Sequence, residues 1–159
     1  MRLSYLQNHY DLEEVEGGYR FLTDNNVEYY LTFIEYPVVG EFLATKIYMF
    51  NIDRTSPKVG QKDVRLVNTI LYVLHHFFEK NDDAIITISD ISDDRQAARK
   101  RLFDSWFNTY NDGRLEKLDG KFVIEDSPVF VSLLYSAENF NHRNLVKAFQ
   151  TLIDNNFYC

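Results

Sequence analysis

The fold is decided by residues 84–110, which read AIITIS (84–89), DISDD (90–94) and RQAARKRLFDSWFNTY (95–110). The β-branched run that begins at Ala84 is typical of a buried strand. Ser92, Asp93 and Asp94 are of the residue types that favour helix N-caps. The stretch therefore predicts a strand, an acidic turn and a helix. The wide apolar face of that helix comprises Ala98, Leu102, Phe103, Trp106, Phe107 and Tyr110.

The first two turns of this helix are unusually basic, although the positive end of the helix dipole lies there and disfavours cations. The bases are Arg95, Arg99, Lys100 and Arg101. In one interpretation, nearby acids pair with them on a solvated face, and these acids are Asp90, Asp93, Asp94 and Asp104. In the other, the helix-start amides and Arg95 or Arg99 hold a phosphate or carboxylate. We favour ion pairing, because three neighbouring aspartates repel an anion.

Length and composition favour a single domain over residues 1–159, since 159 residues that are 45% hydrophobic bury a substantial core. The one cysteine, Cys159, is the last residue, so neither an internal disulfide nor a cysteine-rich zinc site is expected. We find no signal-peptide pattern and no stretch long enough to span a bilayer. A soluble, cytoplasmic protein without membrane contact is expected.

Charge and aromatic content indicate the kind of partner. The formal net charge of −7 opposes binding to a nucleic-acid backbone. Aromatic residues make up 16% of the chain, and Tyr and Trp concentrate where a partner covers a surface. We therefore expect a protein partner. Half-buried positions on sheet faces would explain the same aromatics equally well. The candidate residues for a partner or an anion are Arg95, Arg99, Arg101 and Trp106.

The order of elements predicts an α/β (α+β) fold, with a single mixed, largely antiparallel sheet and helices packed on it. A partly helical lead-in is expected over residues 1–18. Strands are expected at 19–22, 27–34, 42–50, 84–89, 121–125 and 129–135, with turns at 24–26, 111–113 and 119–120. Helices are expected from Asp63 to Lys80, from 95 to 110, and from Asn141 onward with Leu145, Val146, Phe149, Leu152 and Ile153 inward. The inward face of the helix that Asp63 begins comprises Val64, Val67, Ile70, Leu71, Leu74, Phe77 and Phe78.

Over residues 19–135 this β-meander-α-β-α-β-β order resembles the Gcn5-related N-acetyltransferase fold. The resemblance implies a coenzyme A site at the start of the helix at 63–80, where backbone amides wrap the pyrophosphate. The residues that would form it are Arg54, Lys58, Gly60, Lys62 and Arg65. Only one glycine stands in that loop, and Phe103 stands where the family has a tyrosine that protonates the leaving thiolate. The resemblance therefore implies an acyltransferase-like fold without the usual cofactor and proton-transfer residues.

The sequence is also similar to a family of small, uncharacterised bacterial proteins with the signature D-x-RQAAR-x-RLFD-x-WF, which spans Asp93 to Phe107 here. That family carries no known activity. The net charge of −7, the many tyrosines and the missing catalytic patterns lead us to expect a non-catalytic protein-interaction module, accessory or antitoxin-like, and no cofactor. The alternative is a divergent acyl-CoA-dependent N-acyltransferase, so the sequence leaves open whether the protein is an enzyme.

Two polar groupings are weaker candidates for chemistry. His75 and His76 are adjacent on a helix and point in different directions, so they do not face one metal ion. One of them is expected to be buried and hydrogen-bonded. Asp90, Asp93 and Asp94 follow a strand end, where open α/β sheets place sites. We interpret these three as solvated turn carboxylates, with a Mg²⁺ or Mn²⁺ site as the alternative, and predict no metal centre.

Overall fold

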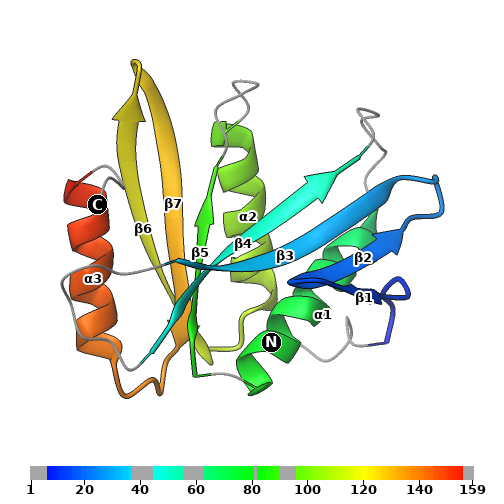
Figure 1. The fold of residues 1–159 in the computed structure, drawn as a ribbon, viewed down its shortest axis with the longest axis horizontal. Helices are drawn as coiled ribbons and strands as arrows, with labels where there is room; N and C mark the ends of the chain where they lie inside the picture. Colours follow the sequence, from blue (N-terminus) through cyan, green and yellow to red (C-terminus); the bar gives the residue numbers. More distant parts are fainter. Residues whose placement is uncertain (1–6, 37–44, 56–62, 81, 90–95, 156–159) are drawn as a thin grey trace. The chain divides into compact units, whose positions relative to one another are not determined.

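Seven strands form one mixed sheet in the order β1-β2-β3-β4-β5-β7-β6 (Figure 1). The computed structural model describes residues 7–36, 45–55, 63–80, 82–89 and 96–155. The strands are β1 (Glu13–Val15), β2 (Gly18–Leu22), β3 (Glu28–Tyr36), β4 (Ile47–Arg54), β5 (Ala84–Ile88), β6 (Leu115–Ile124) and β7 (Ser127–Ser136). The helices in this part of the chain are α1 (Val64–Lys80), α2 (Gln96–Tyr110) and α3 (His142–Asp154).

The predicted fold class and element order are confirmed. Strand β4 pairs in parallel with β5, and α1 connects the two. Antiparallel pairs join β1 to β2, β2 to β3, β5 to β7 and β6 to β7. The fold is thus α+β, with a mixed and mostly antiparallel sheet. Among the described residues, no helix has the length and hydropathy needed to cross a membrane.

Contacts divide the chain into two compact units. Unit 1 falls within Met1–Ile34 and Phe50–Asn81, and unit 2 within Glu35–Met49 and Asp82–Cys159. Unit 1 holds β1, β2, α1 and most of β3, whereas unit 2 holds β5, β6, β7, α2 and α3.

In unit 1, α1 begins where Asp63 caps it, as predicted. The Asp63 carboxylate accepts hydrogen bonds from the backbone amides of Arg65 (3.0 Å) and Leu66 (3.3 Å). Tyr10 joins the preceding chain to the helix, since its hydroxyl donates to Asp63 (2.6 Å) and its amide to Thr69 Oγ1 (2.9 Å). The helix is substantially buried through Ile70, Leu71, Val73 and Leu74. Val64 was predicted to face inward but is 57% exposed, because the buried residues of α1 begin one turn later, at Asn68.

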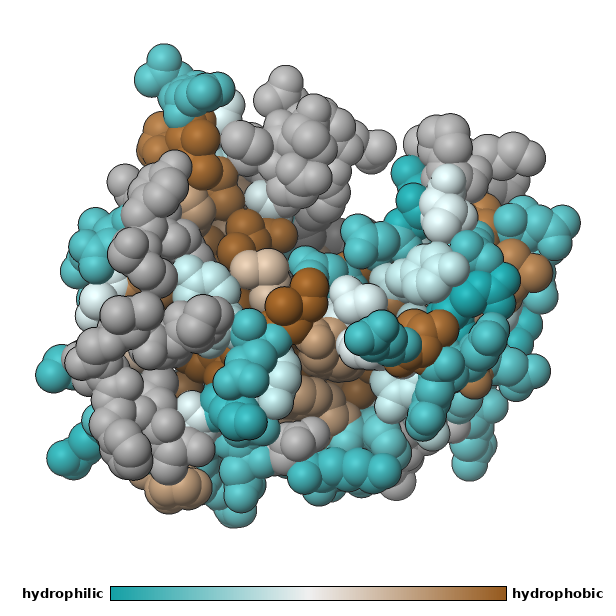
Figure 2. Space-filling model, viewed as in Figure 1, coloured by the Kyte–Doolittle hydropathy of each residue, from teal (hydrophilic) through white to brown (hydrophobic). Residues whose placement is uncertain are grey.

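Unit 2 has an aliphatic core built from β5, β7 and α3. Its central side chains include Ile86, Leu133, Leu145 and Phe149, all of them buried. The predicted inward positions of α3 are confirmed for Leu145, Phe149 and Leu152, but Val146 is 36% exposed because it lies on the solvent side of that helix. Near the tip of the β6–β7 hairpin, Val123 is 55% exposed, and Figure 2 shows hydrophobic surface toward that end of the hairpin.

Three predicted elements differ from the structure. The lead-in contains no helix at residues 13–15, because β1 pairs with β2 across a turn at Gly17, whose φ of 77° suits glycine. Asp119 and Gly120 lie inside β6 and do not form a turn. Gly120 is needed there because Ile153 of α3 packs on it, and an added Cβ would lie 2.5 Å from Ile153 Cδ1. Residues 37–44, which include the expected start of the strand at 42–50, lie outside the described chain.

The end of that third strand is also different, since β4 continues past Phe50 to Arg54. The backbone amide of Thr55, the next residue, still donates to the carbonyl of Glu28 in β3 (3.1 Å). This backbone contact explains the extra length of β4. It could not be predicted, because the polar residues at the end of β4 show no strand pattern. By contrast, the predicted turn at 24–26 is confirmed, with Asn26 at a φ of 59°.

A candidate binding pocket in unit 1

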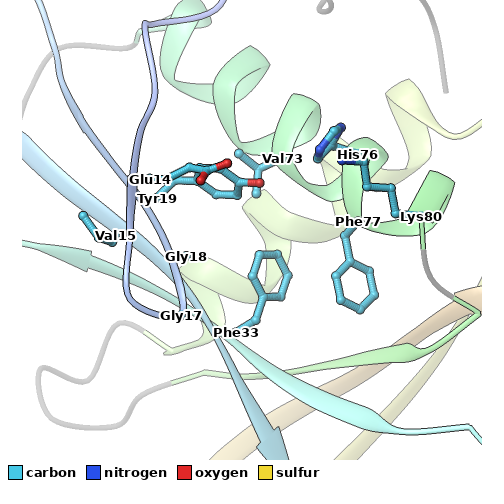
Figure 3. A pocket seen from close by; sticks show the side chains of 10 residues that line it. All are labelled: Glu14, Val15, Gly17, Gly18, Tyr19, Phe33, Val73, His76, Phe77 and Lys80. Carbon is cyan, nitrogen blue, oxygen red and sulfur yellow. The ribbon is translucent and has the colours of Figure 1, made fainter.

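A pocket of about 280 Å³ opens in unit 1 between the first hairpin and the last turns of α1 (Figure 3). The hairpin contributes Glu14, Val15, Gly17, Gly18 and Tyr19, β3 contributes Phe33, and α1 contributes Val73, His76, Phe77 and Lys80. This volume is near the lower end of small-molecule sites, which span roughly 300–1,000 Å³. It suits one large side chain or a small ligand.

Two glycines fix the hairpin wall. Gly17 adopts the left-handed turn conformation, and its carbonyl accepts a hydrogen bond from the amide of Phe33 (2.8 Å). Gly18 lies so close to β3 that an added Cβ would be 1.9 Å from the carbonyl oxygen of Leu31. A side chain at Gly18 would displace the hairpin, so this wall depends on glycine.

The helical wall follows from the spacing of its residues. Val73, Phe77 and Lys80 are separated by four and three positions, and residues at these spacings share one face of an α-helix. His76 lies next to Phe77 on the same part of the helix and also lines the pocket. The helix thereby contributes apolar side chains followed, at its end, by a cation.

Stacked aromatic rings line the pocket and lie beside it. The rings of Phe33 and Phe77 stack with centroids 4.9 Å apart and planes at 8°. Phe33 also contacts Phe50 of β4, at 5.0 Å between centroids. Beside the pocket, His76 stacks with Tyr72 (6.2 Å), and Tyr72 stacks with His9 (4.0 Å). These rings form an apolar platform with restricted rotamers.

Charges of opposite sign stand on the two walls, as Figure 3 shows for Glu14 and Lys80. Glu14 pairs in register with Tyr19, and within the described residues neither Glu14 nor Lys80 has an ion-pair partner. Burial raises the pKa of the Tyr19 hydroxyl, and the negative charge of Glu14 and the nearby Tyr72 raise it further. The Tyr19 hydroxyl is therefore protonated near neutral pH and can donate a hydrogen bond into the pocket.

A second polar cluster lies in unit 2 and joins α2 to β6 and β7. Lys117 Nζ lies 2.7 Å from both Asp104 and Asp119, and Lys100 of α2 also pairs with Asp104. Ser132 donates a hydrogen bond to Asp119 (2.7 Å). We call Lys100, Asp104, Lys117, Asp119 and Ser132 the charge network.

The charge network is electrostatically balanced. Burial acts to lower the pKa of Lys117, but its hydrogen bonds to Asp104 and Asp119 and their negative charges outweigh burial, so this pKa is raised. Burial likewise acts to raise the pKa of Asp119, but hydrogen bonds from Lys117 and Ser132 and the charges of Lys117 and Lys100 lower it overall. Each carboxylate therefore has a cation beside it, and the arrangement stabilises α2 on the hairpin.

The structure places few of the predicted site residues near one another. Arg54 is exposed at the end of β4. Arg65 packs over the Tyr10 ring at 4.1 Å and donates to Asp24 and to the carbonyl of His9. Lys58, Gly60 and Lys62 lie outside the described residues, and the coenzyme A prediction for all five positions is untested.

Of the candidates on and before α2, the structure describes the side chains of Arg101 and Trp106. Arg101 is exposed and Trp106 is half-buried. Arg95 and the side chain of Arg99 lie outside the described residues. So do Asp90, Asp93 and Asp94, the acids that were considered as a metal site. Of the expected ion pairs with the helix bases, the pair between Lys100 and Asp104 is confirmed.

His75 is buried and contacts Glu79 (2.8 Å), which confirms that one of the adjacent histidines is buried and hydrogen-bonded. Among the described residues, no group of three or more His, Cys, Asp or Glu side chains is placed to bind a metal ion.

The pocket was not predicted from the sequence, because the residues of its hairpin wall were interpreted as partly helical. A signal was present in the Gly17-Gly18 pair between two short extended runs, since glycines between such runs are typical of a hairpin. The approach of Lys80 to Glu14 and Tyr19 could not be predicted without the fold, because Lys80 lies about sixty positions further along the chain than the hairpin.

The fold and the pocket define the protein only as an α+β protein with a small pocket that is lined by aromatic, aliphatic and charged side chains. The chain belongs to a family of unknown function, DUF6169, whose model matches residues 62–151. The match includes α1 and the charge network, but not the hairpin wall. No curated protein matches the chain, and no solved structure matches it.

Proposed function

We propose that the protein is a non-catalytic interaction module that receives a side chain of a partner protein in the pocket of unit 1. The observation that carries the proposal is the pocket itself, with Phe33, Val73 and Phe77 as its apolar surface and polar groups around them. Interface hot spots have this form, because a buried anchor side chain surrounded by a polar rim supplies most of the affinity.

The charge network supports the same proposal from the other unit. Lys117 pairs with both Asp104 of α2 and Asp119 of β6, so these charged groups already have partners within unit 2. The polar groups of the pocket, in contrast, lack such partners: Glu14 and Lys80 have no ion pair within the described chain. Unpaired rim charges are suited to contacts with a partner.

The proposal is tested with peptides selected from a random display library on the wild-type protein. Tyr19→Ala removes part of the pocket wall and is expected to weaken the selected peptides by about tenfold or more. The matched aromatic control is Trp106→Ala on α2, which is expected to leave their affinity unchanged. Both variants are first checked for cooperative melting.

The reverse pattern would place the interface on α2. If Trp106→Ala abolishes binding and Tyr19→Ala does not, the candidate surface with Arg101 and Trp106 is the interface, and the pocket is not. Failure to select any peptide that loses affinity with Tyr19→Ala would also contradict the proposal.

The second candidate is a divergent acyl-CoA-dependent N-acyltransferase. It is favoured by the element order and by the parallel step from β4 through α1 to β5, which puts the start of α1 where the resemblance implies the pyrophosphate. A ligand that binds only the native state raises the melting midpoint. This candidate predicts an upward shift with millimolar acetyl-coenzyme A that Lys62→Glu abolishes, and an unchanged midpoint would contradict it.

A further inference from the structure

We propose that the pocket takes an extended segment of the partner in which one large apolar residue stands between a basic residue on the hairpin side and an acidic residue on the α1 side. This inference rests on the proposed function and adds the partner's chemistry to it.

The apolar residue follows from the size and lining of the pocket. A volume of about 280 Å³ is bounded by the stacked rings of Phe33 and Phe77 and by the buried Val73. Aromatic and large aliphatic side chains gain most from such a surface, because they bury a large area and pack on ring faces and edges.

The basic residue follows from the acidity of the hairpin wall. Glu13, Glu14 and Glu16 stand close together in the sequence of this hairpin, and its one described base, Arg20, is already paired with Glu13 and Glu28. Glu14 is the member of this group that lines the pocket. A cation of the partner would supply the ion pair that Glu14 lacks among the described residues.

The acidic residue follows from the opposite wall. Lys80 ends α1 and borders the pocket, with His76 one turn before it (Figure 3). The acid in this turn of the helix, Glu79, already pairs with His75. A carboxylate of the partner can therefore pair with Lys80 without displacing an ion pair of Lys80 with any described residue.

An extended segment is favoured by the position of the hairpin in the sheet. β1 is the end strand of the seven-stranded order, and in the described chain it pairs only with β2. A segment that runs along an edge strand gains backbone hydrogen bonds and points alternate side chains to one face. Such a segment can insert one side chain beside Glu14 and Val15, while the side chains two positions to either side, which point to the same face, reach the two charged walls.

The test uses fluorescence anisotropy with labelled peptides that differ only in the residues around a central Phe. The probes carry Lys and Glu, Lys and Lys, or Glu and Glu at the flanking positions two residues to either side of Phe, in both chain directions, and a fourth series replaces Phe with Ala. The wild-type protein is expected to prefer one Lys-and-Glu peptide. Lys80→Glu should shift the preference to the peptide with two Lys flanks, and Glu14→Lys to the one with two Glu flanks, each by about tenfold.

The control variants change the charge equally but lie in unit 2. Lys121→Glu and Glu138→Lys replace exposed residues of that unit and should leave the peptide preference unchanged. If the charge reversals at Glu14 and Lys80 do not alter the preference while replacement of Phe by Ala abolishes binding, the inference is overturned and the proposed function stands. If no Phe peptide binds the wild-type protein at millimolar concentration, both are overturned.

Discussion

Helix α1 buries Ile70, Leu71, Val73 and Leu74 in unit 1, whereas none of the described side chains of α2 in unit 2 is fully buried. Phe103, Trp106 and Phe107 of α2 are half-buried. Among the described side chains of α2, Lys100 and Asp104 join the charge network with the β6–β7 hairpin. The two helices are of similar length, yet different forces hold them.

The two kinds of contact respond differently to pH and to salt. Apolar burial does not depend on protonation and is weakened little by salt. Ion pairs depend on the charge of every member and lose strength when one member titrates or is screened. Attachment of α1, which forms one wall of the pocket, should therefore hold over a wide pH range, and attachment of α2 should not.

The largest expected effect is on the core of α1. Leu74→Ala, at a side chain that is 4% exposed, should lower the free energy of unfolding by about 2–5 kcal/mol, because it removes buried methyl groups and leaves a cavity. The matched variant Phe103→Ala in α2 should cost clearly less, since that ring is only half-buried. Urea unfolding measures the change in unfolding free energy for both variants. Equal changes would contradict the proposed difference between the two helices.

A smaller effect is expected in the charge network. Lys117→Met removes a cation whose side chain is 9% exposed and leaves Asp104 and Asp119 closer to uncompensated, which should cost about 1–3 kcal/mol. The control is Lys121→Met on the same strand, where the exposed lysine has no ion pair with any described residue and the change should stay within about 0.5 kcal/mol. If Lys117→Met is as mild as its control, the network does not hold α2.

The smallest expected effect is a pH dependence. The pKa of Asp119 is lowered from 3.8, so its contribution to stability is fully present above that value and is lost as the pH falls through the lowered pKa. The pKa of Lys117 is raised from 10.5, so its contribution is fully present below that value and is lost as the pH rises through the raised pKa.

The measurement is urea unfolding of the wild-type protein and Asp119→Asn across the acid range. The difference in unfolding free energy between them should shrink as the pH falls, whereas the cost of Leu74→Ala should remain the same. A difference that does not change with pH would show that the carboxylate of Asp119 contributes through shape and not through charge.

The sequence predicted the elements whose signals are local. The β-branched run of β5 and the Asp63 cap of α1 are both confirmed, because burial pattern and capping chemistry lie within a few residues. Gly120 was misread as a turn, because the need for a glycine there arises from Ile153 of α3, more than thirty positions away. No local pattern contains that requirement.

The same limit explains the candidate site. The basic residues at the start of α2 stood out in the sequence, and the pair that the structure describes there, Lys100 with Asp104, belongs to a structural network. The pocket depends on the hairpin, β3 and α1 converging, and each of its polar residues is ordinary by itself. Whether a charged residue here pairs within the fold or is available to a partner depends on the groups that face it, and the sequence alone does not show which groups these are.

The most direct test of the central claim, that the pocket of unit 1 is the binding site, is a backbone amide NMR titration of the wild-type protein with a selected peptide. We expect chemical-shift changes to be concentrated in the β1–β2 hairpin and in the last two turns of α1, and the amide shifts of residues 100–107 in α2 to remain unchanged. Changes concentrated around Arg101 and Trp106, with the hairpin unaffected, would contradict it.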